Sequence, residues 1–206
     1  MTPARISDLG ETLFETLSHE DFLAMRGLAN EVPIFVQTYD PVDDDALRQM
    51  LRRLSSRLRS VGVSVECVDL FDLVLDELEE HGVLTPLLEG EAEWDRADVL
   101  ETLQNLADPK AHLVPRLVTA MGGPDTQLTL VTGSGRLYPF LRTHTILESL
   151  QPAMLQRPVV LFFPGEYAQD ADGGSHLRLF GGVASPVITN PYYRAMNLDH
   201  YRTGPR

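Results

Sequence analysis

Four acidic residues of this sequence stand where a metal ion for phosphoryl chemistry would be held. Asp40 and Asp43 directly follow an apolar segment, Asp69 ends the next one, and Glu166 follows a later one. Parallel strands end at a shared edge of the sheet, where open α/β sheets bind ligands, and carboxylate oxygens suit Mg²⁺. These residues also fit a plainer role as helix N-caps and turn residues, and their spacing matches no hydrolase motif.

A glycine-rich turn, Gly133-Ser134-Gly135, occupies the place of a phosphate-binding loop, after a predicted strand and before a predicted helix. The dinucleotide-binding pattern would need glycine where Tyr138 stands. A nucleophile elbow around the serine would need glycine in place of Thr132 and Arg136. Both patterns fail, and two interpretations remain: a structural tight turn, or a loop that contacts a partner or an anion.

Other catalytic and metal-binding motifs fail on elementary requirements. A P-loop needs lysine directly after glycine, whereas Lys110, the only lysine, follows Pro109. One cysteine, Cys67, cannot build a structural zinc site, and no two of the six histidines are four residues apart. We therefore expect no cofactor and no enzyme of these classes.

The segment 43–60 predicts an amphipathic helix that is rich in arginine. Arg48, Arg52 and Arg59 fall on one face of this helix by their spacing. That face is either a solvated surface or a basic docking face for an acidic partner or nucleic acid.

Apolar runs and helical periodicity alternate along the chain, which predicts a mostly parallel sheet. We expect residues 1–206 to form a single α/β domain, a three-layer sandwich with four or five strands and helices on both faces. A helical insertion at 83–121 separates the second strand from the third. The predicted strands are 32–39, 63–67, 128–131, 158–163 and 177–180, and the helices beside the insertion are 43–60, 70–81 and 139–150.

The string at 162–167, FFPGEY, predicts a strand that is covered on both faces and then a turn. Phe162 and Phe163 point to opposite faces of a strand, so helices on both faces would bury both. Pro164-Gly165 suits a type II turn, in which proline fixes φ and glycine supplies a positive φ.

This turn would present two side chains beside the glycine turn of the third strand, if the third and fourth strands are neighbours. An arginine, Arg136 or Arg142, would then pair with Glu166. We expect this edge of the sheet to be the functional surface, which contacts a partner chain or a small ligand. Its predicted members are Gly133, Ser134, Gly135, Arg136, Arg142, Glu166 and Tyr167.

Composition narrows the class of protein. The net charge of −13 opposes direct nucleic-acid binding, because phosphate neutralisation supplies most of the non-specific affinity. A lone cysteine suits a reducing compartment. No apolar stretch reaches signal-peptide length at the N-terminus or the roughly 20 residues that span a bilayer. We expect a cytoplasmic protein without membrane association.

Four blocks of the sequence resemble the BrxB family of BREX phage-defence proteins. They are the first strand with its exit, 34–41, and three later blocks. The most characteristic is RPVVLFFPGEY at 157–167, and the others are LVTGSGRLYPFLRTHTILESL at 130–150 and NPYYRAMNL at 190–198. Their order and spacing also fit, so the resemblance covers roughly residues 5 to 200.

The resemblance implies a role in a BREX-type system, which combines a large ATPase, a DNA methyltransferase and a PglZ-type protein. It implies a small accessory subunit and a PglZ-type partner among the other BREX components. It supplies no catalytic residues. A non-catalytic adaptor or regulatory subunit is therefore the leading expectation. The alternative is a Mg²⁺-dependent enzyme that acts on phosphate esters or nucleotides through the carboxylates Asp40, Asp43 and Asp69.

Overall fold

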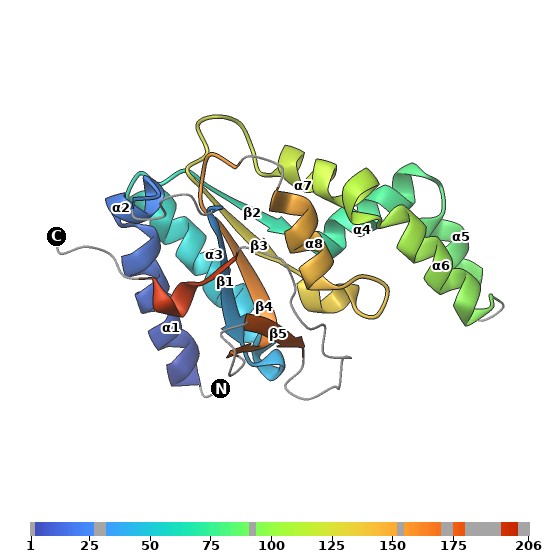
Figure 1. The fold of residues 1–206 in the computed structure, drawn as a ribbon, viewed down its shortest axis with the longest axis horizontal. Coiled ribbons are helices and arrows are strands. Elements are labelled where there is room, and N and C mark those ends of the chain that lie inside the picture. The colour runs from blue at the N-terminus through green and yellow to red at the C-terminus, as the bar shows by residue number, and fades with distance from the viewer. Residues whose placement is uncertain are drawn as a thin grey trace.

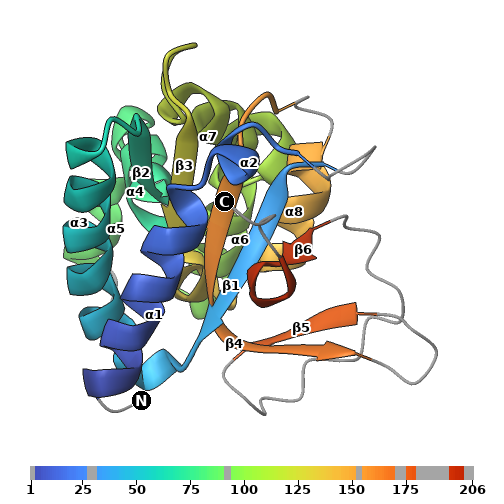
Figure 2. The ribbon, with the colours of Figure 1, turned by 90° about the vertical axis from the view of Figure 1, so that its left-hand side faces the viewer.

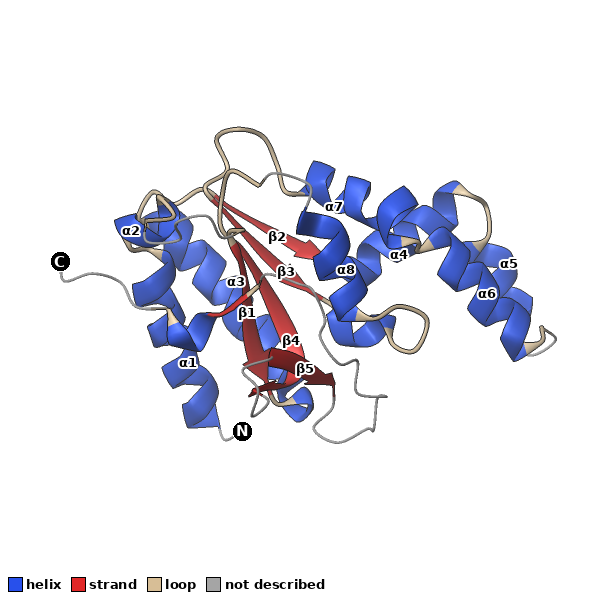
Figure 3. Cartoon of the chain, viewed as in Figure 1, coloured by secondary structure: helices blue, strands red, loops and turns tan. Residues whose placement is uncertain are grey.

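The computed structural model describes residues 3–26, 32–90, 94–151, 155–169, 175–179 and 195–201. Helices and strands alternate along the chain, and the strands gather in one twisted sheet (Figure 1, Figure 3). Within these residues, no helix is both long and apolar enough to pass through a membrane.

A parallel sheet forms the centre of the molecule, in the order β2-β3-β4-β1-β6. A sixth strand, β5, pairs with β4 in the antiparallel direction. This arrangement confirms the predicted α/β fold with a mostly parallel sheet. The strands are β1 Ile34–Tyr39, β2 Val65–Asp69, β3 Leu128–Thr132, β4 Val159–Gln169, β5 Ser175–Leu179 and β6 Met196–Asn197.

Helices cover both faces of the sheet, as a parallel sheet requires (Figure 2). One face packs against the first three helices, α1 Pro3–Leu17, α2 Glu20–Leu23 and α3 Asp44–Ser60. The other face packs mainly against α4, α7 and α8. The helices that follow β2 are α4 Leu70–Glu80, α5 Leu84–Gly90, α6 Arg96–Leu106, α7 Val114–Ala120 and α8 Thr143–Leu150.

The two faces of β4 belong to two separate hydrophobic cores. Phe162 packs in the core on the α3 side and is fully buried. Phe163 packs in the core on the α4 side and is 2% exposed. The prediction that both phenylalanines are buried on opposite faces is confirmed. Burying a phenylalanine side chain stabilises a fold by about 2 kcal/mol, so this strand is a main anchor of both layers.

The predicted type II turn at Pro164-Gly165 is wrong. The strand β4 continues through both residues to Gln169, and Gly165 has a φ of 156° instead of the roughly +80° of such a turn. The backbone remains extended because β5 pairs with it from Gly165 to Gln169. The predicted edge strand at 177–180 is thus the partner of an extended β4, which leaves the parallel sheet and runs with β5 beyond it (Figure 2).

Two element boundaries also differ from the prediction. A 3₁₀ turn at Ser134–Leu137 follows β3, and α8 begins only at Thr143 instead of near residue 139. The second strand begins at Val65, and its buried residues are Val65 and Val68, whereas Cys67 is exposed. Buried and exposed residues do not alternate regularly along β2 because it is an edge strand of the sheet.

The helical insertion between β2 and β3 is confirmed. A buried carboxylate, Glu77, ties the insertion to α4, the helix that follows β2. Glu77 forms an ion pair with Arg116 of α7, and its Oε1 lies 2.8 Å from Nδ1 of His112 in the π-helical turn Pro109–Leu113. Burial raises the pKa of Glu77, but the hydrogen bonds and charges of Arg116 and His112 outweigh burial and lower the pKa. The carboxylate therefore remains ionised and joins three helical segments.

We predict that Glu77→Gln destabilises the protein at pH 7 by about 1–2 kcal/mol, because an amide loses the charge-assisted bonds to Arg116 and His112. A lowered folded-state pKa stabilises the protein above the unfolded pKa, and this stabilisation is lost as pH falls through the folded pKa. The difference between wild type and variant should therefore shrink below about pH 4.3. Urea unfolding at pH 7 and pH 3.5 measures it. The exposed neighbour Glu79, changed to Gln, is the control, and an equal effect of both variants would contradict this role.

Candidate functional site

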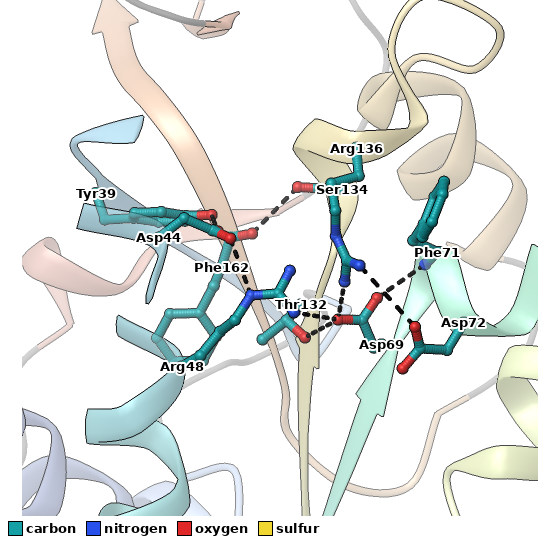
Figure 4. Close-up of polar contacts among 10 residues, drawn as sticks. All are labelled: Tyr39, Asp44, Arg48, Asp69, Phe71, Asp72, Thr132, Ser134, Arg136 and Phe162. Atoms are coloured by element: carbon teal, nitrogen blue, oxygen red, sulfur yellow. Dashed lines mark hydrogen bonds and ion pairs between the residues drawn. The ribbon is translucent and has the colours of Figure 1, made fainter. Parts of the chain in front are cut away.

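The polar residues at the carboxyl edge of the sheet form a network centred on Asp69 (Figure 4). Asp69 ends β2, and its side chain is 15% exposed. Its Oδ1 accepts a hydrogen bond from the backbone N of Phe71 at 2.9 Å, which caps α4 as the sequence predicts. Its Oδ2 accepts a hydrogen bond from Oγ1 of Thr132, the last residue of β3, at 3.1 Å.

Two arginines from opposite layers reach the same carboxylate. Arg136, in the 3₁₀ turn after β3, forms an ion pair with Asp69. Arg48, on α3, places Nη1 3.7 Å from Asp69 Oδ2. Because α3 covers one face of the sheet and α4 the other, Asp69 links both helical layers across the edge.

Arg136 is oriented by its surroundings toward β2 and α4. Its guanidinium lies 4.8 Å from the ring centroid of Phe71, and Nη1 lies 4.0 Å from Asp72. Of the two arginines predicted to pair with Glu166, Arg136 turns instead to Asp69, and pairing of Arg142 with the exposed Glu166 stays a prediction. The sequence pattern could not give this direction because it depends on which strand lies beside β3.

A second carboxylate, Asp44 at the start of α3, extends the network to β1. Tyr39 donates a hydrogen bond to Asp44 Oδ1 at 2.6 Å, and Arg48 Nε donates to Oδ2 at 2.9 Å. Burial and the bond to Asp44 raise the pKa of Tyr39 well above its usual range. Burial opposes ionisation of Asp44, but the hydrogen bonds from Tyr39 and Arg48 prevail and lower its pKa. The tyrosine therefore remains a proton donor to a fixed carboxylate.

The glycine turn fits closely between this network and β4. Gly133 has a φ of 84°, and a Cβ there would overlap Oδ1 of Asp69. A Cβ on Gly135 would overlap the ring of Pro164. Between them, Ser134 is 2% exposed and donates a hydrogen bond to the carbonyl of Phe162 at 3.1 Å. The expected proximity of the turn to β4 is confirmed, and the geometry favours the structural interpretation of the turn.

The candidate metal ligands do not converge. Asp40 accepts a hydrogen bond from Val42 N at 3.1 Å and caps the 3₁₀ turn Pro41–Asp43. Asp43 is buried and is the N-cap residue of α3, as predicted, although its side chain makes no capping hydrogen bond there. Across the described residues, no group of three His, Cys, Asp or Glu side chains is arranged to hold a metal ion.

The predicted basic face of α3 is partly engaged by the chain itself. Arg48 belongs to the edge network, and Nη2 of Arg59 donates a hydrogen bond to the carbonyl of Val65 at 2.8 Å. Arg52 is exposed. Two of the three arginines thus contact the protein, so a docking face would have to use Arg52 and its neighbours.

The other three members of the predicted partner surface, Arg142, Glu166 and Tyr167, come from α8 and β4. Arg142 is half-buried at the N-terminal boundary of α8. The backbone of Tyr167 pairs with Leu177 in β5, and its side chain is not among the described ones. Sequence reasoning missed Tyr39 and Asp44, although the Asp44–Arg48 spacing of four residues on a helix is a readable signal for an ion pair.

The fold and the edge network define a class of open α/β protein whose strand-end carboxylates pair with its own arginines. A family model described as BREX protein BrxB matches residues 66–198. The chain belongs to this family, which gives it a role in the BREX phage-defence system.

Two related proteins, each called BREX protein BrxB, match most of the chain. The one from Bacillus cereus (strain H3081.97) is 28% identical over 197 residues, which cover 94% of this chain and 97% of the relative. The one from Escherichia coli O9:H4 (strain HS) is 23% identical over 187 residues, with 88% and 86% covered. No solved structure matches the chain.

We predict that Gly133→Ala lowers the free energy of unfolding by about 1–3 kcal/mol more than Gly62→Ala does. Both glycines have a φ near 85°, so alanine costs each about 1–2 kcal/mol of backbone strain. The two positions differ in space, because a Cβ on Gly62 meets nothing within 4 Å and one on Gly133 meets Asp69. Urea unfolding of both variants measures the difference. Equal losses would mean that the turn does not depend on close contact with Asp69.

Proposed function

We propose that the chain is a non-catalytic adaptor or regulatory subunit of a cytoplasmic BREX complex. Family membership supplies the system, and one observation supports the absence of catalysis. The strand-end side chains that a hydrolase would use are engaged within the chain: Asp69 by Arg136, Arg48 and Thr132, and Asp44 by Tyr39 and Arg48. Asp69 instead joins the two helical layers, and Asp44 joins β1 to α3.

We further propose a PglZ-type protein as the partner, as the resemblance of the sequence implies. The carboxyl edge with the β4–β5 extension is the proposed contact surface, because Glu166 is exposed where β4 leaves the parallel sheet (Figure 2). The net charge of −13 supports a protein partner over direct contact with nucleic acid.

Affinity purification of the tagged chain from its native operon, with and without nuclease, tests this function. We expect recovery of a PglZ-type protein in stoichiometric amount, unchanged by nuclease. Recovery of no BREX component, together with Mg²⁺-dependent hydrolysis of phosphate esters by the pure chain, would reverse the proposal in favour of an enzyme.

The double variant Glu166→Ala, Tyr167→Ala tests the contact surface. Glu166 is exposed, and substitutions of exposed side chains usually change stability within about 0.5 kcal/mol, so we expect a nearly unchanged melting temperature. Recovery of the partner and phage resistance should both be lost. Asp125→Ala is the control, since this exposed acid lies in the loop that precedes β3, at the opposite edge of the sheet. Full protection by a normally folded double variant would remove this surface from the proposal.

A further inference from the structure

The helices α5 and α6 form an arm that extends away from the sheet (Figure 1, Figure 3). The base of the arm is anchored, because Leu84, Leu103 and Leu106 pack against the core on the α4 side. The part of the arm that lies farther from the sheet is less buried. The eleven residues of α6 include no buried side chain, although a helix of a compact domain normally buries one face. Packing within the described chain therefore does not account for the outer part of the arm.

Two large apolar side chains are exposed on the outer part of this arm. Leu88 of α5 is 68% exposed, and Trp94, which precedes α6, is 38% exposed. The indole lies against the backbone of Gly90, where a Cβ would come within 2.8 Å of Nε1. Single exposed leucines are ordinary, but tryptophan is the residue type most enriched among the anchors of protein interfaces. Leu88 and Trp94, held by short helices on either side, have the character of such anchors.

Acidic side chains surround these two residues in the sequence of the arm. Glu89, Asp95, Asp98 and Glu101 are all exposed, and Arg96 is the one cation among the described residues of α5, α6 and the segment between them. Asp95 also caps α6 through Ala97 N at 2.7 Å, so its position is fixed. A segment that exposes apolar and acidic side chains together repels phosphate and attracts cationic surfaces.

From these contacts we propose that the outer arm, defined as Leu88, Glu89, Trp94, Asp95, Asp98 and Glu101, is a docking site for a partner protein. The partner presents an apolar pocket rimmed by arginine or lysine. This inference rests on the proposed function in that the partner is a component of the BREX complex. Charge complementarity selects a basic protein surface, and the anchors supply most of the binding energy, as in interfaces generally.

Because Trp94 is the only tryptophan, it supplies a probe of the arm alone. The full chain labelled with 5-fluorotryptophan has one ¹⁹F resonance, and the probe partner is the BREX component recovered in the affinity purification. We expect the resonance to shift and broaden when this purified component is added. A resonance that stays unchanged while the complex forms would overturn the inference.

Separate variants test the contributions of the apolar anchors and of the acidic side chains to binding. Leu88→Ser should weaken binding of the purified component by about tenfold or more. The variant Glu89→Gln, Asp98→Asn, Glu101→Gln keeps the apolar anchors and the Asp95 cap, and it should weaken binding and make it less dependent on salt. Val61→Ser is the matched control, because Val61 is 56% exposed at the end of α3, outside the arm.

The outcomes distinguish this inference from the proposed function. If no BREX component binds the wild-type chain, both fail. If a component binds and the arm variants bind it as tightly as Val61→Ser does, only the arm is excluded. A resonance that shifts with the concentration of the chain alone would assign the arm to contacts between copies and overturn the proposed partner.

Discussion

The carboxylate of Asp69 is the point on which the arrangement of the layers depends. It caps α4, accepts a hydrogen bond from Thr132 of β3, and attracts Arg136 and Arg48 from opposite sides of the sheet. A half-buried carboxylate with a single ion-pair partner would stabilise the fold little, because the free energy lost on removing its hydration offsets the attraction to that partner. Four contacts offset that loss and fix the ends of β2, β3 and α3 relative to each other.

The parallel sheet explains why the polar network lies at its edge. Strands covered on both faces must be nearly continuous in apolar residues, so charged side chains are confined to the strand ends. The turn after β3 then needs glycine at 133, since any larger residue would occupy the space of Asp69. Glu77 has a comparable role away from the sheet edge, since it holds the helical insertion through Arg116 and His112 at the base of the arm. Asp69 thus serves the sheet edge and Glu77 serves the insertion.

Sequence patterns predicted those features that depend on local burial and capping. The strands around Ile34, Leu130 and Leu161, the cap at Asp69 and the burial of Phe162 and Phe163 follow from periodicity and residue type. The neighbouring of β3 and β4 is also as predicted, whereas contacts that depend on later parts of the chain or on the full strand order were not predicted. The continuation of β4 past Pro164 depends on β5, which comes later in the chain, and the choice of Arg136 between Asp69 and Glu166 depends on strand order. The exposure of the arm could not be predicted from the sequence, because the spacing of leucines does not show whether a helix packs against another element.

The two proposed contact surfaces leave the molecule in different directions. The β4–β5 extension projects beyond the carboxyl edge of the sheet, whereas the arm of α5 and α6 leaves from the layer that contains α4 (Figure 1). The arm joins the layer that Glu77 holds through Arg116 and His112, and β4 lies against the glycine turn through the hydrogen bond from Ser134 to Phe162. An adaptor must present its contacts at a fixed spacing, because ordering a flexible connection on binding would cost conformational entropy. In this chain the buried charges of Asp69 and Glu77 therefore contribute rigidity inside the fold, and the proposed contacts fall to exposed residues of the arm and of the β4–β5 extension.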